Sequence, residues 1–361
     1  MSEAVQGDRP PTQEFERVLT AAATAQASFD EEQLPLAKRV QRFLHSYPTT
    51  VPFVVLLLGL LLGVVVNFSH FVTASNLSTV LTQVTIIAIL GIAQTLVILT
   101  AGIDLSVGLI MVLSSEVMGR LAVVDGLSIF LAFPLGLICG LACGFLNGTL
   151  ITRLKMPPFI VTLGTLSIIG ALNIFYSQSE TIREQDLEDS APFLQLMGTP
   201  IDIMGARIIV GSFLLIGLAY VVWYMLNRTA YGRHVYATGD DPEAARLAGI
   251  NTDKILLSVY VLAGLISAIA GWVLIGRIGA ISPTAGENAN LDSITAVVIG
   301  GTSLFGGRGS IVGTLIGALI VGVFRSAVSL AGLDVLWQEF AIGVLIIVAV
   351  ALDQWIRRIS N

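Results

Sequence analysis

The sequence predicts an all-α polytopic membrane protein of about ten transmembrane helices, and three observations support this fold class. Hydrophobic residues make up 55% of the 361 positions and charged residues only 12%, a balance that soluble domains do not reach. The mean hydropathy is +0.85. Apolar runs long enough to cross a bilayer follow one another with short polar gaps. Lipid is therefore the predicted solvent for most of the chain.

Residues 1–47 precede the first apolar run and are predicted to form a polar, partly disordered arm. The arm contains several acidic residues and then a basic group, Lys38, Arg39 and Arg42. A signal peptide would begin with positive charge followed at once by a short apolar core, whereas here the apolar run starts only after the basic group. We expect a cytoplasmic N-terminal arm followed by one membrane domain over 48–361.

The membrane domain is predicted from its apolar runs, of which the first and the eighth are short and the third contains charged residues. Cytoplasmic loops of membrane proteins are enriched in lysine and arginine. Placing the N-terminus inside puts most of the 19 basic residues on the cytoplasmic side, so both termini are predicted to be cytoplasmic. The runs lie at 51–67, 79–101, 104–124, 127–151, 158–178, 206–226, 255–276, 291–305, 309–331 and 335–355.

Two polar gaps are longer than the others in this topology. The acidic gap 179–205 falls on the periplasmic side, and the gap 227–254, basic at both ends, falls in the cytoplasm. Spans two to five and seven to ten can be superposed as two halves, and an offset of five spans inverts one half. An inverted repeat is therefore predicted, as in many transporters. Its sequence support is short, since Asp104 opens the third span and Asp292 lies at the start of the eighth.

Glycines recur at four-residue spacing in two of the predicted spans. Such stripes let helices approach closely in lipid, where the hydrophobic effect cannot drive association. We predict internal helix packing rather than a subunit interface. The two cysteines, Cys139 and Cys143, lie in one of these spans and are predicted to be packing residues. The glycines are Gly136, Gly140, Gly144 and Gly148, and then Gly309, Gly313 and Gly317.

The sequence lacks the motifs of several enzyme classes. No G-x-x-x-x-G-K-[ST] loop occurs, so the chain is not predicted to bind ATP itself. There is no G-x-S-x-G elbow, and His45, His70 and His234 are too far apart in the topology to form a metal site. The net charge of −6 gives no support for nucleic acid as a partner. We expect no catalytic residues, no metal and no cofactor.

Ionisable residues inside membrane spans are functional candidates because they are costly in lipid. Glu116 and Arg120 lie four apart, so they are predicted to neutralise each other on one helix face, with a substrate role as the alternative. Asp104 is predicted to cap the helix that it opens. A solute pathway would need polar side chains within the spans, and the candidates are Gln94, Asp104, Glu116, Asn147 and Asn173.

The cytoplasmic gap contains a short predicted helix. Asp241 can cap its start, and Pro242 suits the first helical position. Glu243 complements the helix dipole, residues 244–248 favour helix, and Gly249 ends it. The pattern predicts a two-turn helix outside the membrane. A docking surface for a cytoplasmic partner and an ordinary loop are both compatible with this pattern.

Four segments carry a resemblance to a known family: 99–108 (LTAGIDLSVG), 157–164 (PPFIVTLG), 232–249 and 298–310 (VIGGTSLFGGRGS). With them, the whole membrane region resembles permeases of monosaccharide ABC importers of the ribose, xylose and fructose type. Residues 180–183 and 353–356 look most like the fructose importer permeases of rhizobia. The implied function is a permease subunit in the inner membrane of a bacterium, with a fold similar to the ten-helix cobalamin-importer permeases.

The resemblance also implies partners. Two permease copies would form the pathway, ATP-binding subunits would dock from the cytoplasm and bind the ATP, and a periplasmic sugar-binding protein would deliver the substrate. A secondary sugar carrier acting alone, a channel, and an ABC permease for another small polar solute are the alternatives. The segment 239–249 would be the coupling element, and its docking residues would be Gly239, Asp240, Asp241, Pro242, Glu243, Ala244, Ala245 and Gly249.

Overall fold

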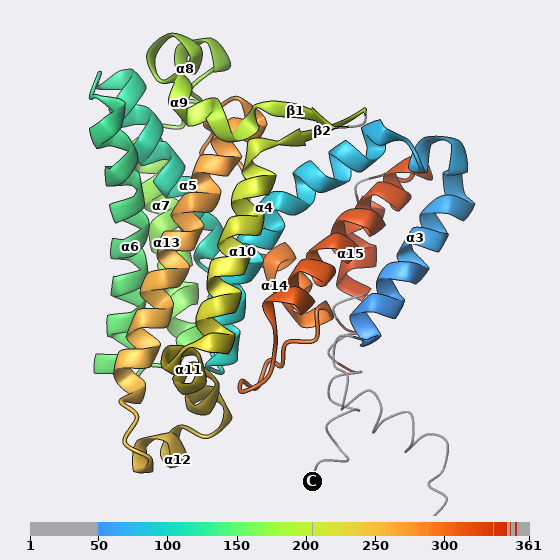
Figure 1. The fold of residues 1–361 in the computed structure, drawn as a ribbon. Helices are drawn as coiled ribbons and strands as arrows, with labels where there is room; N and C mark the ends of the chain where they lie inside the picture. The colour runs from blue at the N-terminus through green and yellow to red at the C-terminus, as the bar shows by residue number, and fades with distance from the viewer. Residues whose placement is uncertain are drawn as a thin grey trace, which may run out of the picture. The chain divides into compact units, whose positions relative to one another are not determined.

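The long helices of the computed structural model confirm the predicted fold class (Figure 1). Among the residues that the structure describes, eight helices are long and apolar enough to cross a membrane. The predicted arm at 1–47 lies outside the residues that the structure describes. The tenth predicted span is described only in part, with 336–344 helical. The described residues are 50–203, 205–286, 288–334, 336–344, 347 and 351.

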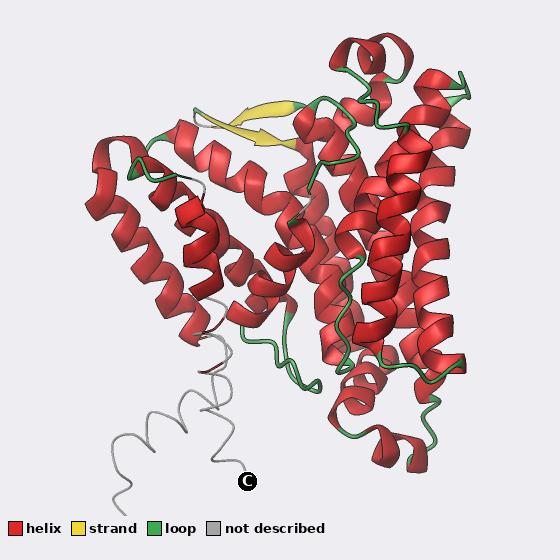
Figure 2. Ribbon diagram, turned by 180° about the vertical axis from the view of Figure 1, so that it is seen from behind, coloured by secondary structure: helices red, strands yellow, loops and turns green. Residues whose placement is uncertain are grey.

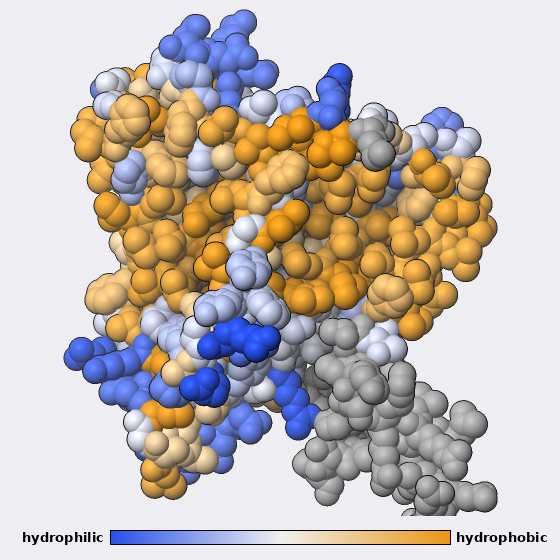
Figure 3. Space-filling view, viewed as in Figure 1, coloured by the Kyte–Doolittle hydropathy of each residue, from blue (hydrophilic) through white to orange (hydrophobic). Residues whose placement is uncertain are grey.

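Each long helix coincides with a predicted apolar run, because in lipid a helix satisfies its backbone hydrogen bonds within itself. On the face that Figure 3 shows, a band of hydrophobic side chains covers these helices between two more polar ends. The helices are α3 (Thr50–Phe71), α4 (Ala74–Leu99), α5 (Val107–Gly119), α6 (Ile129–Arg153), α7 (Pro158–Ser177), α10 (Val210–Arg228), α13 (Thr252–Ile278) and α15 (Ile311–Leu330).

Helix α13 lies at the centre of one group, against α4, α5 and α6, and α15 lies against α3, α4 and α14. The glycine stripes make the closest of these contacts. A Cβ added to Gly140 would lie 2.5 Å from the carbonyl oxygen of Gly264, and one added to Gly144 would overlap the backbone of Tyr260. The prediction that the stripes serve internal packing is confirmed.

The eighth predicted span is wrong in length. Helix α14 covers only Ala289–Ile299, about 16 Å at 1.5 Å per residue, roughly half of the hydrocarbon core. Its chain then leaves the helix through Gly300 and Gly301, the second of which has φ +86°, and continues as loop 300–310. Gly301 ends the helix because glycine allows a backbone conformation that other residues rarely adopt.

The third predicted span also begins later than expected. Helix α5 starts at Val107 with Ser106 as its N-cap, so 100–106 is a non-helical segment between α4 and α5. The starts of α5 and α14 touch: a Cβ on Gly108 would lie 3.1 Å from the Asn290 amide nitrogen, and Asn290 Nδ2 donates to the Leu105 carbonyl at 3.1 Å. A repeat relating the third and eighth spans would have such a contact, and the inverted repeat stays a prediction.

Glu116 and Arg120 form no direct ion pair in the described part of the chain, although the positive charge of Arg120 still acts on the Glu116 carboxylate. Arg120 Nη1 donates to the Ser177 carbonyl at 2.6 Å and lies 3.8 Å from Glu180 Oε2. A π-helical turn, Arg120–Val124, begins at this arginine. The backbone between the two residues is α-helical, since the Arg120 amide donates to the Glu116 carbonyl, and it is the guanidinium group that turns away toward Ser177 and Glu180.

The two polar ends of the helix bundle carry different small elements (Figures 1 and 2). One end, called the hairpin end below, holds the antiparallel strands β1 and β2, with Pro200 opposite Ile209. The opposite end, called the α12 end, holds two short helices. Strand β2 takes up the first residues of the predicted span 206–226. The elements are α8 (Glu184–Ser190), α9 (Pro192–Gln195), the 3-10 turn Leu196–Gly198, β1 (Pro200–Ile203) and β2 (Ala206–Ile209) at the hairpin end, and α11 (Ala230–Asp240) and α12 (Pro242–Leu247) at the other.

Candidate functional site

Helix α12 confirms the two-turn helix predicted from its caps. The Asp241 carboxylate accepts hydrogen bonds from the amides of Glu243 at 2.9 Å and Ala244 at 3.0 Å. Pro242 occupies the first turn, where its missing amide hydrogen costs nothing. Gly249 ends the segment with φ +86°, a conformation that favours glycine.

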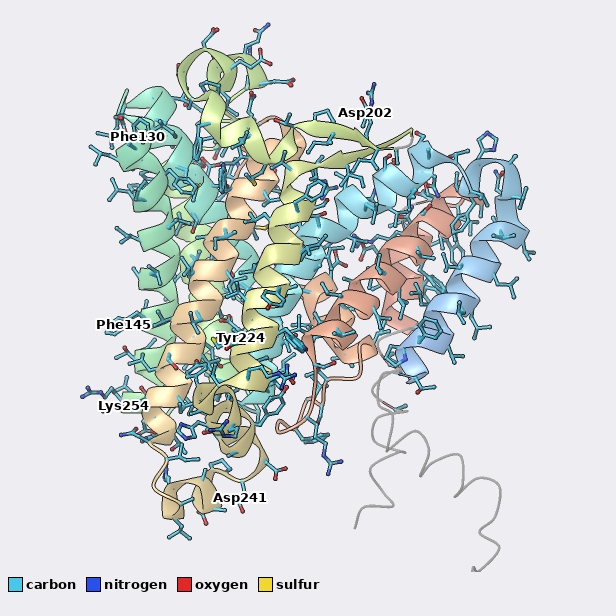
Figure 4. All side chains as sticks on the ribbon, viewed as in Figure 1. Phe130, Phe145, Asp202, Tyr224, Asp241 and Lys254 are labelled. Carbon is cyan, nitrogen blue, oxygen red and sulfur yellow. The ribbon has the colours of Figure 1, made fainter. Side chains whose placement is uncertain are left out.

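The surface of α12 is unusually exposed. Leu247 is apolar and lies outside the membrane helices, yet 91% of its surface is accessible. Asp241 lies at the opposite end of the helix bundle from the hairpin (Figure 4). Of the eight predicted docking residues, Gly239 and Ala245 are buried and the other six are exposed. Gly239 and Asp240 belong to α11 rather than to α12, so they extend the predicted element into a second helix.

Helix α11 was not predicted, and it connects α12 to the membrane helices. A Cβ on Gly239 would overlap the carbonyl of Leu99 at the end of α4. Gly307 of loop 300–310 donates its amide to the same carbonyl at 3.0 Å. Tyr236 donates its hydroxyl to the Gly309 carbonyl at 2.9 Å. Burial raises the pKa of Tyr236, so the hydroxyl keeps its proton and its role as donor.

Charged side chains tie α12 to its surroundings. Arg246 donates from Nε to Thr252 Oγ1 at 2.8 Å, and Arg246 Nη2 lies 3.6 Å from Asp253 Oδ1. Lys155, between α6 and α7, lies 2.7 Å from Asp253 Oδ2. Exposed pairs of this kind contribute at most about 1 kcal/mol each. They nevertheless connect α12, the start of α13 and the α6–α7 turn at one point.

A buried polar cluster surrounds the segment 100–106. Asp104 accepts at Oδ1 from the Ser106 amide at 2.8 Å and from the Ser106 hydroxyl at 2.6 Å. Asn147 of α6 donates to that hydroxyl at 2.9 Å, and Gln94 of α4 donates to the Asp104 carbonyl. The prediction that Asp104 caps α5 is therefore wrong. Its carboxylate accepts from the amide of Ser106, the N-cap residue, and not from an amide of the helix.

Three of the five predicted pathway residues, Gln94, Asp104 and Asn147, meet in this cluster. Each is at most 1% exposed and keeps one oxygen without a hydrogen-bond partner in the described part of the chain. Asn173 lies elsewhere and donates to the Pro283 carbonyl at 2.8 Å. Glu116 is buried, and neither of its carboxylate oxygens has a partner among the described residues. Their role in a pathway stays a prediction.

A charge network in the membrane region was missed by the sequence analysis. Arg325 of α15 lies 2.8 Å from Asp292 of α14 and 3.4 Å from Glu339 of the last helix, measured from Nη2 to the carboxylate oxygens. The sequence could have indicated this network, because two acidic residues and one arginine lie in three successive predicted spans.

Comparisons with known proteins agree with this arrangement. The family model described as "Branched-chain amino acid transport system / permease component" matches residues 76–350. The fructose import permease protein of Rhizobium meliloti is 54% identical over 97% of both chains. The ribose import permease protein of Bacillus subtilis is 40% identical, over 84% of this chain and 92% of its own. The D-allose transport system permease protein of Escherichia coli is 32% identical, over 80% of this chain and 86% of its own.

No solved structure matches the chain, so the likeness to the cobalamin-importer permeases stays a prediction. The family match covers most of the chain and all the described elements from α4 to the last helix. The relatives match at both ends of the bundle and through its centre. The chain therefore belongs to the family of membrane permease components that this family model describes.

Proposed function

We propose that the chain is the transmembrane permease subunit of an ATP-binding cassette importer for a monosaccharide, with fructose as the first candidate and ribose or xylose as the alternatives. The identity to the fructose import permease, 54% over nearly the full length, supports fructose. The ribose import permease is more distant at 40%.

The α12 end is proposed to face the cytoplasm of a bacterial cell, with both termini on that side and the hairpin end facing the periplasm. The basic residues Arg153, Lys155, Arg233 and Lys254 gather at the α12 end, in agreement with the distribution expected of cytoplasmic loops. The acidic α8 would then face the periplasmic sugar-binding protein. The bacterial inner membrane is the proposed location.

The chain is proposed to act without catalysis of its own. Its sequence has no phosphate-binding loop, so ATP would be bound and hydrolysed by a separate subunit docked on α12. Two copies of the permease would form the pathway and alternate between outward and inward access. The dimer rests on the family resemblance, and no partner chain is needed for the contacts described above.

The observation that carries the proposal is the exposed, capped helix α12. Leu247 at 91% exposure is an apolar anchor that water does not favour, and the rest of α12 is held in place by Asp241 and by Arg246. Contacts of α11 with α4 and with loop 300–310 connect this helix to the membrane region. A docked ATPase that moves α12 would therefore act on both membrane elements.

The test is uptake of labelled fructose into liposomes that contain the purified permease, its ATP-binding partner and its sugar-binding protein. We expect uptake only with ATP and all three proteins. Glu243→Arg, Leu247→Asp and Gly249→Pro should reduce ATPase co-purification and uptake while the permease still enters the membrane. Lys254→Glu, an exposed charge reversal at the same end, is the control and should leave both unchanged.

Two outcomes would contradict the proposal. Uptake by the permease alone, driven by an ion gradient, would favour a secondary carrier. Normal uptake and normal ATPase binding in all three α12 variants would remove the docking assignment, even if the chain is a permease.

A further inference from the structure

The charge network Asp292–Arg325–Glu339 is the strongest feature that the proposed function leaves unexplained. It draws one side chain from each of α14, α15 and the last helix. The side chains differ in exposure: 8% for Asp292, 21% for Arg325 and 45% for Glu339. The network therefore begins inside the bundle and reaches its surface at Glu339.

The network lies within the membrane region, close to its hairpin end. Arg325 is about 8 Å from the end of α15, at 1.5 Å per residue. Arg277 is in the last turn of α13, its side chain is exposed, and the charge of Arg325 acts on it electrostatically. Within the described residues, Arg277 has no hydrogen bond and no ion pair.

Helices α14 and α15 do not need this network to be held together. Helices α14 and α15 already meet through their glycines: a Cβ on Gly317 or on Gly313 would overlap the backbone of α14 or of Gly300. Ion pairs that are taken from water into a membrane are costly, and functional sites are where they persist. An exposed carboxylate at this depth must face water or another polar surface rather than lipid.

The composition of the network suggests the kind of ligand. Two guanidinium groups and two carboxylates carry no net charge together, which favours a neutral ligand over an ion. The guanidinium groups supply only donors and the carboxylates only acceptors. A neutral ligand that satisfies both must offer donors and acceptors side by side, as the neighbouring hydroxyls of a sugar do.

We propose that Arg277, Asp292, Arg325 and Glu339 form a polyol-binding site at the hairpin end of the pathway, where sugar hydroxyls are held as they enter the permease. Glu339 and Arg277 contact the sugar directly, and Arg325 positions Glu339 while Asp292 holds Arg325. The assignment rests on the proposed function, because it takes the hairpin end to be the side from which the sugar enters.

The first test asks whether Glu339 faces water. A chain with Cys139→Ala and Cys143→Ala receives one new cysteine, Glu339→Cys, and the assembled transporter is treated with a membrane-impermeant maleimide from the hairpin side. Asp202→Cys on the exposed hairpin is the positive control and Leu131→Cys on the apolar face of α6, 57% exposed, is the negative one. We expect labelling of Glu339→Cys at least about tenfold faster than of Leu131→Cys, and slower labelling when sugar-loaded binding protein is present.

Labelling as slow as that of Leu131→Cys would overturn the site, since it would put Glu339 against lipid or a closed protein surface. Fast labelling that anionic lipid slows and sugar-loaded binding protein does not would also overturn it, by identifying a lipid headgroup as the ligand. Neither outcome depends on whether ATP drives uptake, so a failure here is distinct from a failure of the proposed function.

The second test measures sugar recognition. Glu339→Gln keeps the side-chain shape and leaves the Asp292–Arg325 pair in place, so the chain should fold. It should raise the KM for uptake by about tenfold or more and alter the preference between fructose and its epimers. Asp202→Asn, a carboxylate at the same end and outside the site, should alter neither. Unchanged KM and unchanged epimer preference in Glu339→Gln would overturn the site.

Discussion

The start of α5 and the start of α14 place an aspartate and a serine in similar positions, but the two aspartates bond differently. Asp104 precedes α5, is 1% exposed and accepts both hydrogen bonds from Ser106 in its own segment. Asp292 lies in the first turn of α14 and pairs with Arg325 of another helix. The first aspartate fixes a local backbone shape, whereas the second is the buried end of a network that joins three helices and reaches the surface at Glu339. The contrast is between a carboxylate that is bonded within its own segment and one that pairs with a different helix.

The largest effect on stability is expected at Asp104. Asp104→Ala leaves the amide and the hydroxyl of Ser106 buried without their acceptor, at about 1–3 kcal/mol for each unsatisfied group. The midpoint of thermal unfolding of the purified permease in detergent should fall clearly. Asp104→Asn, which keeps one acceptor oxygen, should recover part of the loss. An unchanged midpoint in Asp104→Ala would mean that the segment 100–106 is not held by this carboxylate.

A smaller effect on stability is expected at Asp292. In Asp292→Ala, Arg325 keeps Glu339 as its partner and is itself partly exposed, so the loss should be about 1 kcal/mol. Uptake should fall by more than the unfolding midpoint suggests, because the site loses its inner acceptor. A stability loss as large as that of Asp104→Ala would mean that Asp292 mainly stabilises the fold.

The contact between the two helix starts can be tested at Gly108. A Cβ there would lie 3.1 Å from the Asn290 amide nitrogen, so Gly108→Ala should push the two starts apart by a few tenths of an ångström. The expected cost is about 1 kcal/mol, at the lower end of the range for overpacking. Gly164→Ala in α7, where no atom lies within 4 Å of the added Cβ, is the matched control. Equal unfolding midpoints for both variants would show that the starts do not depend on each other.

The smallest effect is expected at the other end of α14. Tyr236→Phe removes the hydrogen bond to Gly309 in loop 300–310 and should cost about 0.5–1.5 kcal/mol or less. Its main result should be ATP hydrolysis that responds less to the sugar-loaded binding protein, measured in the reconstituted complex. Full stimulation in this variant would indicate that the contacts of Gly239 and Gly307 with Leu99 are enough to connect α11 to loop 300–310.

Much of the fold follows from the sequence because lipid imposes simple rules on it. The apolar runs locate the long helices, the four-residue glycine spacing locates the close contacts, and the residues from Asp241 to Gly249 define α12 from local preferences. These features depend on short segments only. The helix α11 was missed because its polar residues and its glycines resemble a loop when they are read without the α4 end against which Gly239 packs.

The remaining differences arise from tertiary structure. Hydropathy alone does not separate α14 from a complete span, since residues 300–305 are apolar enough to extend the run. The direction of the Arg120 side chain depends on Ser177 and Glu180, which are distant in sequence. The charge network is a property of three helices, and each of its members is uninformative when considered alone. The pathway candidates can be identified in the sequence as polar residues within spans. That Gln94, Asp104 and Asn147 lie together can be seen only in the structure.

The glycine contact between α6 and α13 has a mechanical consequence. At Gly140, Gly144 and Gly264 backbone meets backbone, so there are no side chains whose rotamers could change to let one helix slide along the other. The two helices should therefore move as a single rigid body. The segments 100–105 and 280–286, which lack α-helical hydrogen bonds, are then the places where the domain can hinge.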